Sequence, residues 1–356
     1  MRLLTHILNF RIWFILIVGL HTLSAQSGAV DQAIRKYDHE LGEWQRSVAS
    51  TEDQTILKRL ISEKPTPRPV SRIIFQGISA ELDKPSSMRA ISWIYKHDPK
   101  YLSSKDAENK GEVIRNNLTR YHYKYPGAGE LCMTISRSFS PLDMSFLEKV
   151  SSQSPSKEDQ GIASLAISSA LSGLGDEPEL LARRLKHLKK AIQNIPTETR
   201  LSGVPATDII SDQLYVIQNL TKGRVAPLFS GLDVAGKTVQ YAGAAGKVTA
   251  IVFFTEQSLV GETLPLIKSM KSLSDDLGTN MIGVYKGDLI KLRSSLANER
   301  VSWPTLYDSS GEVFKKYRVN QPSVVYVLDQ AGKIQNVGEP NALINLTIRA
   351  LANSTE

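Results

Sequence analysis

Thiols and imidazoles are scarce in this sequence, and their scarcity limits the chemistry that the chain can carry. Only one cysteine, Cys132, occurs among 356 residues, so a single chain can form no disulfide of its own. Six histidines are present, and none of them follows His187. They are scattered, without the spacing of zinc ligands, so the sequence predicts no metal site and indicates no cofactor.

Long apolar segments are absent as well, because the run near the N-terminus covers only residues 12–20. A helix needs about 20 apolar residues to span a bilayer core of roughly 30 Å. Arg2 and Arg11 precede the run, and small or polar residues follow it up to Ala25, which is the pattern of a secretory signal. The alternative is an uncleaved anchor. We expect a signal peptide at 1–25 and an exported bacterial protein, periplasmic or secreted, with no transmembrane segment after cleavage.

The excess of positive charge is small. Lys and Arg number 43 and Asp and Glu 36, so the formal charge is +7, and removal of Arg2 and Arg11 with the signal leaves +5. Such a mild excess does not indicate nucleic-acid binding. The composition, 41% hydrophobic and 22% charged, is typical of a folded globular protein, and the length suits two domains.

Helical periodicity dominates the chain after the signal. Apolar residues recur every three or four positions at Val30, Ile34, Tyr37, Leu41, Trp44 and Val48. A later stripe consists of Leu181, Leu185, Leu188, Ile192 and Ile195. Each stripe indicates a helix that buries one face, and several such helices follow one another with short connections. We therefore predict an all-α helical-hairpin domain at 26–222, in which neighbouring helices cover one another's stripes.

A run at 121–125 alternates tyrosines with cations, as a surface for single-stranded nucleic acid would. Tyr121 and Tyr125, however, continue the apolar stripe of Ile114 and Leu118. We therefore interpret this run as packing of a helix against its neighbours.

Residues 183–190 form a strongly basic helical segment, which an anionic membrane surface would attract. We favour a solvated face opposite the leucine stripe. Cys132 lies in an apolar run between Leu131 and Met133, so we expect a buried, unreactive thiol in preference to a reactive one.

From residue 223 onward, apolar runs of strand length alternate with amphipathic helical segments. The runs at 248–254 and 281–285 are continuously apolar, as central strands buried on both faces would be. Two further runs, 323–328 and 333–337, form a hairpin, and a helix at 341–351 ends the domain. This order predicts an α/β domain at 223–356 with helices on both faces of the sheet.

Four stretches of this domain follow one another in a characteristic order: APLFSGLDVAGKTVQ, GKVTAIVFF, LPLIKSM and YRVNQPSVVYVLDQAGKI. Through them the segment 224–350 resembles the redoxin or AhpC/TSA-type thioredoxin-like family, and the chain as a whole resembles exported bacterial redoxin-domain proteins. The resemblance implies a thioredoxin-like fold and a Cys-x-x-Cys turn that opens the helix after the first central strand. It also implies a cis-proline before the terminal hairpin, beside which substrate backbone docks.

The thiol turn that this resemblance implies has no thiol here. The family's chemistry needs a thiolate whose pKa is lowered at a helix N-terminus, and a second cysteine that resolves the mixed disulfide. The equivalent stretch, 255–262, places Ser258 and Gly261 at the spacing of the two cysteines. Ser258 has no histidine base in its domain, so we expect it to cap the next helix. Gln321 and Pro322 match the position of the cis-proline.

These observations favour an exported thioredoxin-like protein without thiol–disulfide activity that binds or scaffolds a protein or peptide. Its binding residues would be Ser258, Gly261, Gln321 and Pro322, and no catalytic residue is assigned. The alternative is a redoxin-type thiol oxidoreductase or antioxidant that works through Cys132 or a partner's thiol. A third hypothesis is a purely structural component of the cell envelope. The sequence leaves enzymatic activity open and indicates no oligomeric state.

Overall fold

The structure, a computed structural model, describes residues 28–354 apart from residues 52, 104–109, 138–139, 245, 260–261 and 299. The signal peptide predicted at 1–25 lies outside the described residues. The chain folds into two compact units, one up to Ile210 and the other from Ser211. This division falls within α10 (Ala206–Asn219), and the boundary predicted from the sequence lies just after that helix. Within the described ranges, no helix is both long enough and apolar enough to cross a membrane.

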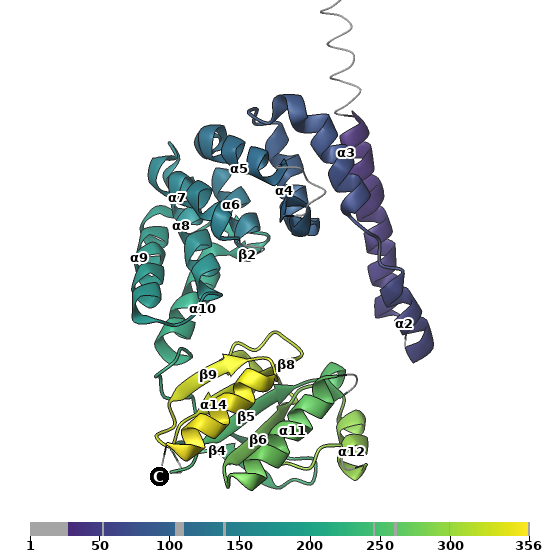
Figure 1. Cartoon of the computed structure of the whole chain (residues 1–356), viewed down its shortest axis with the longest axis vertical. Helices are drawn as coiled ribbons and strands as arrows, with labels where there is room; N and C mark the ends of the chain where they lie inside the picture. The colour runs from purple at the N-terminus through teal and green to yellow at the C-terminus, as the bar shows by residue number, and fades with distance from the viewer. Residues whose placement is uncertain are drawn as a thin grey trace, which may run out of the picture. The chain divides into compact units, whose positions relative to one another are not determined.

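The first unit is built from helices (Figure 1). Its elements are a helix at 28–49, α2 (Gln54–Ser62), α3 (Arg68–Ile78), η1 (Ser79–Glu81), α4 (Ser87–His97), η2 (Pro99–Ser103), α5 (Lys110–Tyr121), η4 (His122–Lys124), α6 (Ala128–Ser136), η5 (Pro141–Asp143), α7 (Met144–Gln153), α8 (Lys157–Ser172) and α9 (Pro178–Asn194). A hairpin of β1 (Arg200–Leu201) and β2 (Val204–Pro205) leads into α10. The prediction of an N-terminal helical domain is confirmed.

α8 lies at the centre of this unit, and all of its residues from Asp159 to Ser168 are buried. Glycine, alanine and serine make up much of the helix, which allows α6, α7 and α9 to approach it. A Cβ atom on Gly161 would lie only 2.7 Å from Cγ1 of Ile195, at the end of α9. Small side chains on α8 therefore set the short distance between its axis and that of α9.

The leucine stripe predicted on α9 is only partly buried. Leu188 is buried, but Leu185 and Ile192 are 41% and 55% exposed. The buried face is instead centred on Leu188 and Ala191 and includes Arg184, whose guanidinium lies 3.7 Å from the Asp176 carboxylate. The predicted buried face of α9 was wrong because α8 packs against α9 through small side chains. Ala191 and the stem of Arg184 fit there, where larger apolar residues would not.

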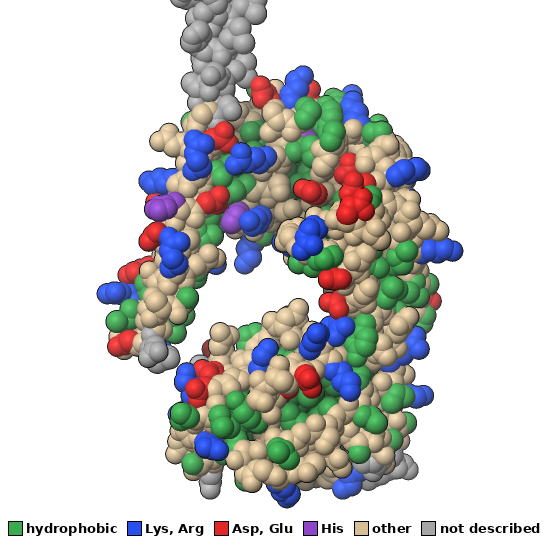
Figure 2. Space-filling view, turned by 180° about the vertical axis from the view of Figure 1, so that it is seen from behind, with side chains coloured by type: hydrophobic (Ala, Val, Ile, Leu, Met, Phe, Trp, Pro, Cys, Tyr) green, Lys and Arg blue, Asp and Glu red, His purple; other side chains and the backbone are tan. Residues whose placement is uncertain are grey.

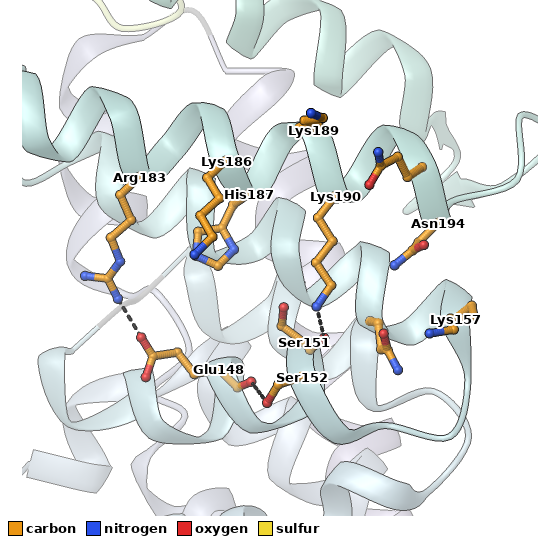
Figure 3. Close-up of a pocket in the computed structure, with 12 residues that line it drawn as sticks. Glu148, Ser151, Ser152, Lys157, Arg183, Lys186, His187, Lys189, Lys190 and Asn194 are labelled. Carbon is orange, nitrogen blue, oxygen red and sulfur yellow. Dashed lines mark hydrogen bonds and ion pairs between the residues drawn. The ribbon is translucent and has the colours of Figure 1, made fainter.

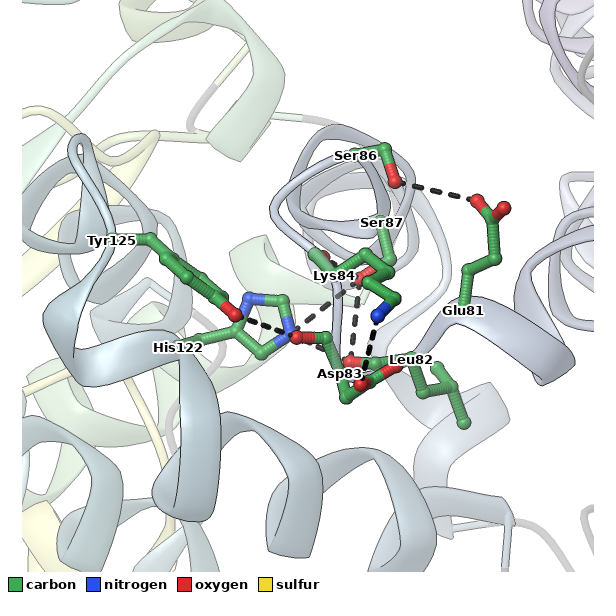
Figure 4. A network of polar contacts seen from close by, with 8 residues as sticks. All are labelled: Glu81, Leu82, Asp83, Lys84, Ser86, Ser87, His122 and Tyr125. Carbon is green, nitrogen blue, oxygen red and sulfur yellow. Dashed lines mark hydrogen bonds and ion pairs between the residues drawn. The ribbon is translucent and has the colours of Figure 1, made fainter.

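The tyrosine-rich run after α5 packs as expected, but through a different residue. α5 ends at Tyr121 and η4 follows, so Tyr125 does not continue the apolar stripe of α5. His122 is buried instead, with its Nε2 atom 2.6 Å from the carbonyl oxygen of Leu82 (Figure 4). The Tyr125 hydroxyl donates to the carbonyl of Asp83 at 2.9 Å. These bonds attach the end of α5 to the segment that precedes α4.

The second unit is an α/β fold. Its elements are β3 (Phe229–Leu232), β4 (Thr238–Tyr241), β5 (Thr249–Phe254), η6 (Glu256–Leu259), α11 (Thr263–Asp276), β6 (Asn280–Tyr285), α12 (Leu289–Ala297), β7 (Thr305–Tyr307), α13 (Glu312–Lys316), β8 (Ser323–Leu328), β9 (Ile334–Gly338) and α14 (Ala342–Asn353). The main sheet has the order β7-β6-β5-β8-β9, with β5, β6 and β7 parallel and β8 antiparallel to both of its neighbours. The predicted α/β architecture is confirmed.

β5 is buried on both faces, which explains its continuous apolar sequence. Val252 and Phe254 face a core shared with α11 and α14, which cover one side of the sheet (Figure 1). Ile251 and Phe253 face the other core, to which α13 and the hairpin of β3 and β4 contribute. The rings of Phe253 and Phe314 lie 5.2 Å apart in an edge-on arrangement. The sheet thereby holds the ends of β5 and β8 in fixed positions.

Candidate functional site

The candidate site lies where the chain leaves β5 and enters β8. Phe254 of β5 pairs with Ser323 of β8, so the residues just beyond these two strand ends meet at one edge of the sheet. The sequence places Ser258 and Pro322 more than 60 residues apart, and the antiparallel pairing of the strands brings them together. Two of the predicted binding residues are therefore neighbours in space.

Ser258 is only 1% exposed, and its hydroxyl is used inside the fold. Its Oγ atom donates to the carbonyl oxygen of Pro322 at 2.6 Å and accepts from the N–H of Thr255 at 3.2 Å. The N–H of Thr255 also lies 3.0 Å from the Pro322 carbonyl. The Ser258 hydroxyl therefore joins the loop after β5 to the loop before β8.

Ser258 does not cap the helix that follows, contrary to the prediction. It lies in η6, whereas α11 begins at Thr263 with Glu262 at the N-cap position. The cap was predicted because the sequence shows a serine ahead of an apolar helical stripe. The Pro322 carbonyl, a partner distant in sequence, binds the hydroxyl instead. The second predicted residue of the turn, Gly261, lies outside the described residues.

Gln321 and Pro322 are exposed at the end of β8. No peptide bond is cis in the described parts of the chain, so the bond between them is trans and the cis-proline implied by the resemblance is absent. The trans isomer is the intrinsically favoured form of an X-Pro bond. Within the same described parts, neither the N–H nor the carbonyl of Gln321 takes part in a backbone hydrogen bond. This residue presents a free donor and a free acceptor at the surface.

The Glu256 side chain joins the turn to α12 through an ion pair and a hydrogen bond. A carboxylate oxygen of Glu256 lies 2.6 Å from Nζ of Lys291, and the other accepts from the N–H of Asp288 at 2.9 Å. These hydrogen bonds, the Lys291 bond first, lower the pKa of the Glu256 carboxyl below its usual value, so it is ionised at neutral pH. Glu256 therefore anchors the turn and is not poised as a general base.

Cys132 lies in α6, in the first unit, and its side chain is completely buried. Burial raises the pKa of the thiol well above its usual value, and the negative charge of Asp159 adds to this shift. A thiolate is the reactive form of cysteine, so this environment is the opposite of a catalytic one. Among the residues that the structure covers, no group of three or more His, Cys, Asp and Glu side chains is arranged to hold a metal ion.

A second site was missed from the sequence. A pocket of about 790 Å³ lies between α7, the start of α8 and one side of α9 (Figure 3). It is lined by Lys157, Arg183, Lys186, His187 and Lys190, among other residues. The available signal was the spacing of three, four and seven residues along α9, which places 183, 186, 187 and 190 on one face.

Comparisons with known proteins concern the second unit. Residues 222–337 match the model of the AhpC/TSA family. The thioredoxin domain of a thiol-disulfide oxidoreductase from Bacteroides vulgatus is similar, with 20% identity over 38% of this chain and 100% of that chain, and a TM-score of 0.34. The pneumococcal exposed lipoprotein thioredoxin from Streptococcus pneumoniae shows 17% identity over 36% and 99% of the two chains, with a TM-score of 0.31. These values support no inference about activity. No curated protein matches the chain.

Proposed function

Because its second unit carries a domain of the AhpC/TSA family in which no cysteine occurs, we propose that this chain is an exported binding or scaffold protein. It takes an extended segment of a protein or peptide at the edge formed by Gln321, Pro322 and the turn at 255–262. It carries out neither thiol–disulfide exchange nor peroxide reduction of its own.

The state of Ser258 is the observation that carries this proposal. A nucleophile must reach its substrate, whereas this hydroxyl is buried and bonded to the Pro322 carbonyl at 2.6 Å. The hydrogen bonds of its Oγ atom join it to backbone groups, and the unit contains no histidine that could act as a base. The Ser258 hydroxyl and the Glu256 carboxylate of the turn are both bonded within the fold, as in a structural element.

The backbone of Gln321 supports the binding role. An extended peptide gains affinity from main-chain hydrogen bonds to free donors and acceptors, and specificity from side-chain contacts nearby. Gln321 offers one N–H and one carbonyl without backbone partners in the described residues, and it is exposed. The hydrogen bond from Ser258 to the Pro322 carbonyl fixes the position of the neighbouring Gln321 before a ligand binds. This preorganisation lowers the entropic cost of binding.

The absence of catalysis is tested with insulin reduction and peroxide turnover by the mature chain, beside its Cys132→Ser variant and an active thioredoxin as the positive control. We expect no turnover above the buffer rate from either form of this protein. Activity that is present in the natural chain and absent from the variant would overturn the proposal in favour of catalysis through Cys132.

The binding edge is tested with a library of extended peptides and two variants of one residue. Gln321→Ala keeps the backbone N–H, whereas Gln321→Pro removes it. For a peptide that binds the natural chain, we expect at least tenfold weaker binding to the proline variant and a change of less than threefold for the alanine variant. Equal affinities for both variants, with unchanged melting temperatures, would show that this backbone does not bind the peptide.

Export is tested by expressing the full chain in a bacterial host and sequencing the N-terminus of the product outside the cytoplasm. We expect cleavage after Ala25, because the small-residue segment that ends there follows a short apolar run. A full-length product that stays in the cytoplasm would contradict this part of the proposal and leave the binding edge to its own test.

A further inference from the structure

The pocket between α7, α8 and α9 has the size of a small-molecule site. Its volume of about 790 Å³ lies within the range of roughly 300–1,000 Å³ that is usual for ligand pockets. Figure 3 shows Arg183, Lys186, His187 and Lys190 reaching from α9 toward α7. The cavity is part of the first unit alone and is independent of the edge at Gln321.

Positive charge dominates the lining of this pocket. Five lysine and arginine residues face one carboxylate, that of Glu148, so the lining carries a net charge of +4 when His187 is neutral. Arg183 pairs with Glu148 at 2.6 Å. Within the part of the chain that the structure describes, Lys157, Lys186 and Lys189 form no ion pair. Figure 2 shows Lys and Arg together with Asp and Glu over the surface in view.

Burial, and after it the neighbouring cations, lowers the pKa values of His187 and Lys190. Burial, followed by the charges of Arg183, Lys186 and Lys190, lowers the pKa of His187 to about 4. Burial and the charges of Lys157 and Lys186 also lower the pKa of Lys190. The Nδ1 atom of His187 is buried and has no hydrogen-bond partner in the described structure. Lys157, Lys186 and Lys189 are exposed and have no anionic partner in the described structure, so they are available to a ligand. The unsatisfied Nδ1 atom of His187 is the buried polar group that needs an explanation.

We propose that this pocket binds a small organic or inorganic anion with two or more phosphate or carboxylate groups. Arg183 and Lys190 lie seven residues apart, which corresponds to about 10 Å along a helix. A single monovalent group cannot contact cations spread over that length, whereas a chain of linked anionic groups can. Lys186 and Lys157 contact its middle and far end.

The distribution of apolar residues around α9 argues against a lipid surface as the ligand of this pocket. A helix that lies on a membrane carries its cations beside the apolar residues that enter the lipid. On α9 the exposed apolar residues are Leu185 and Ile192, two before and five after His187. At about 100° per residue, they lie on the side of the helix opposite the pocket. Apart from Lys189, which follows Leu185 by four residues, the cations of α9 therefore line a concave site and do not flank an apolar contact face.

The experiment is calorimetric titration of the mature full chain with inorganic tripolyphosphate at pH 7, and with citrate as the carboxylate probe. We expect micromolar binding that weakens several-fold when the salt concentration rises from 50 to 200 mM, because salt screens the cations. The double variant Lys186→Gln/Lys190→Gln should bind at least tenfold more weakly. The control, Lys96→Gln/Lys100→Gln, removes the same charge from exposed positions of α4 and η2 and should bind as the natural chain does.

Histidine NMR on the natural chain provides a readout that does not depend on variants. Arg183, Lys186 and Lys190 on α9 act on the charge of His187, and Glu148 on α7 and Lys157 on α8 line the same pocket. A bound polyanion offsets their field, so saturation with tripolyphosphate should raise the pKa of His187 by at least one unit. No binding, equal loss in the control variant, an unchanged His187 titration, or binding to anionic-lipid vesicles but not to tripolyphosphate would each overturn the proposal.

Discussion

Cys132 and Ser258 illustrate at the residue scale how burial decides which chemistry a side chain can perform. The thiol of Cys132 is enclosed in the helical core, and the hydroxyl of Ser258 is bonded inside the fold. Sequence reasoning predicted the burial of the thiol from its apolar neighbours. It could not find the bond from Ser258 to Pro322, because that bond depends on the pairing of β5 with β8.

Labelling of Cys132 with a chromogenic disulfide reagent tests the first of these statements. The thiol is fully buried and its pKa is raised well above the usual value, so the thiolate fraction remains small even at pH 9. We expect native protein to react at least 100 times more slowly than protein unfolded in guanidinium chloride. Complete reaction of the native protein at the rate of a free thiol would show that the helical core opens readily.

His187 makes stability depend on pH. Its pKa is about 4 in the folded chain and about 6.5 in an unfolded chain, so the unfolded state binds the proton more tightly. The stabilising contribution is complete above pH 6.5 and is lost as the pH falls from there toward 4. Between pH 7.5 and pH 5 we expect a loss on the order of 1–2 kcal/mol after allowance for solvent screening. Urea unfolding of His187→Gln should show a smaller decrease; an identical decrease would contradict this origin.

At the scale of elements, the small side chains of α8 determine how the first unit packs. A Cβ atom on Gly161 would meet Cγ1 of Ile195 at 2.7 Å and Cβ of Asn194 at 2.9 Å. Gly173 ends the same helix, but a Cβ atom there has its nearest neighbour at 3.8 Å. The two glycines therefore form a matched pair of positions, one at a close approach between helices and one where a Cβ atom makes only an ordinary contact.

Substitution of this pair measures the contribution of close packing. We expect Gly161→Leu to destabilise the protein by roughly 1–3 kcal/mol or more, because the enlarged side chain must push α9 away. Gly173→Leu, the same substitution at an exposed position, should change the stability by less than about 0.5 kcal/mol. Chemical denaturation followed by helix content measures both values. A Gly161→Leu variant as stable as the natural chain would show that α9 can shift without cost.

A helix or strand could be predicted from the sequence where its burial produces a simple pattern of apolar residues. Where burial depends on a neighbouring element, the prediction failed. β5 is apolar on both faces and was recognisable as a central strand from its composition alone. The face of α9 was misassigned because its partner, α8, buries small residues against it, so Arg184 and Ala191 take the inner positions. The pocket was missed because it exists only where three helices meet, and its cations resemble a solvated face when α9 is considered alone.

Stability is unevenly distributed at the scale of the whole molecule. None of the residues of α2 whose side chains are described is buried, and its Ile56 and Ile61 are 42% and 59% exposed. A bond from Trp44 Nε1 to the carbonyl of Leu60 attaches this helix to the one at 28–49. α8, in contrast, is surrounded by other helices. Regions with few buried contacts open at low free energy, and enclosed regions open only with global unfolding.

Native-state hydrogen exchange tests this contrast. We expect the amides of α2 to exchange fastest among the helices of the first unit, and those of Ile162 to Ser168 to exchange slowest. The free energies of opening should differ by several kcal/mol, because α2 opens locally. Equal protection of the two helices would mean that α2 unfolds together with the core, through contacts stronger than its exposure indicates.

The enclosure of α8 also limits how this half of the chain can be divided or shortened. In a linear array each helical pair touches only its neighbours, so terminal pairs can be removed and the rest still folds. Here α6, α7 and α9 all pack on one helix. A protease cut or a truncation between α6 and α9 would expose the apolar sides of every fragment. A shortened chain that preserves this core must therefore keep 128–194 in one piece.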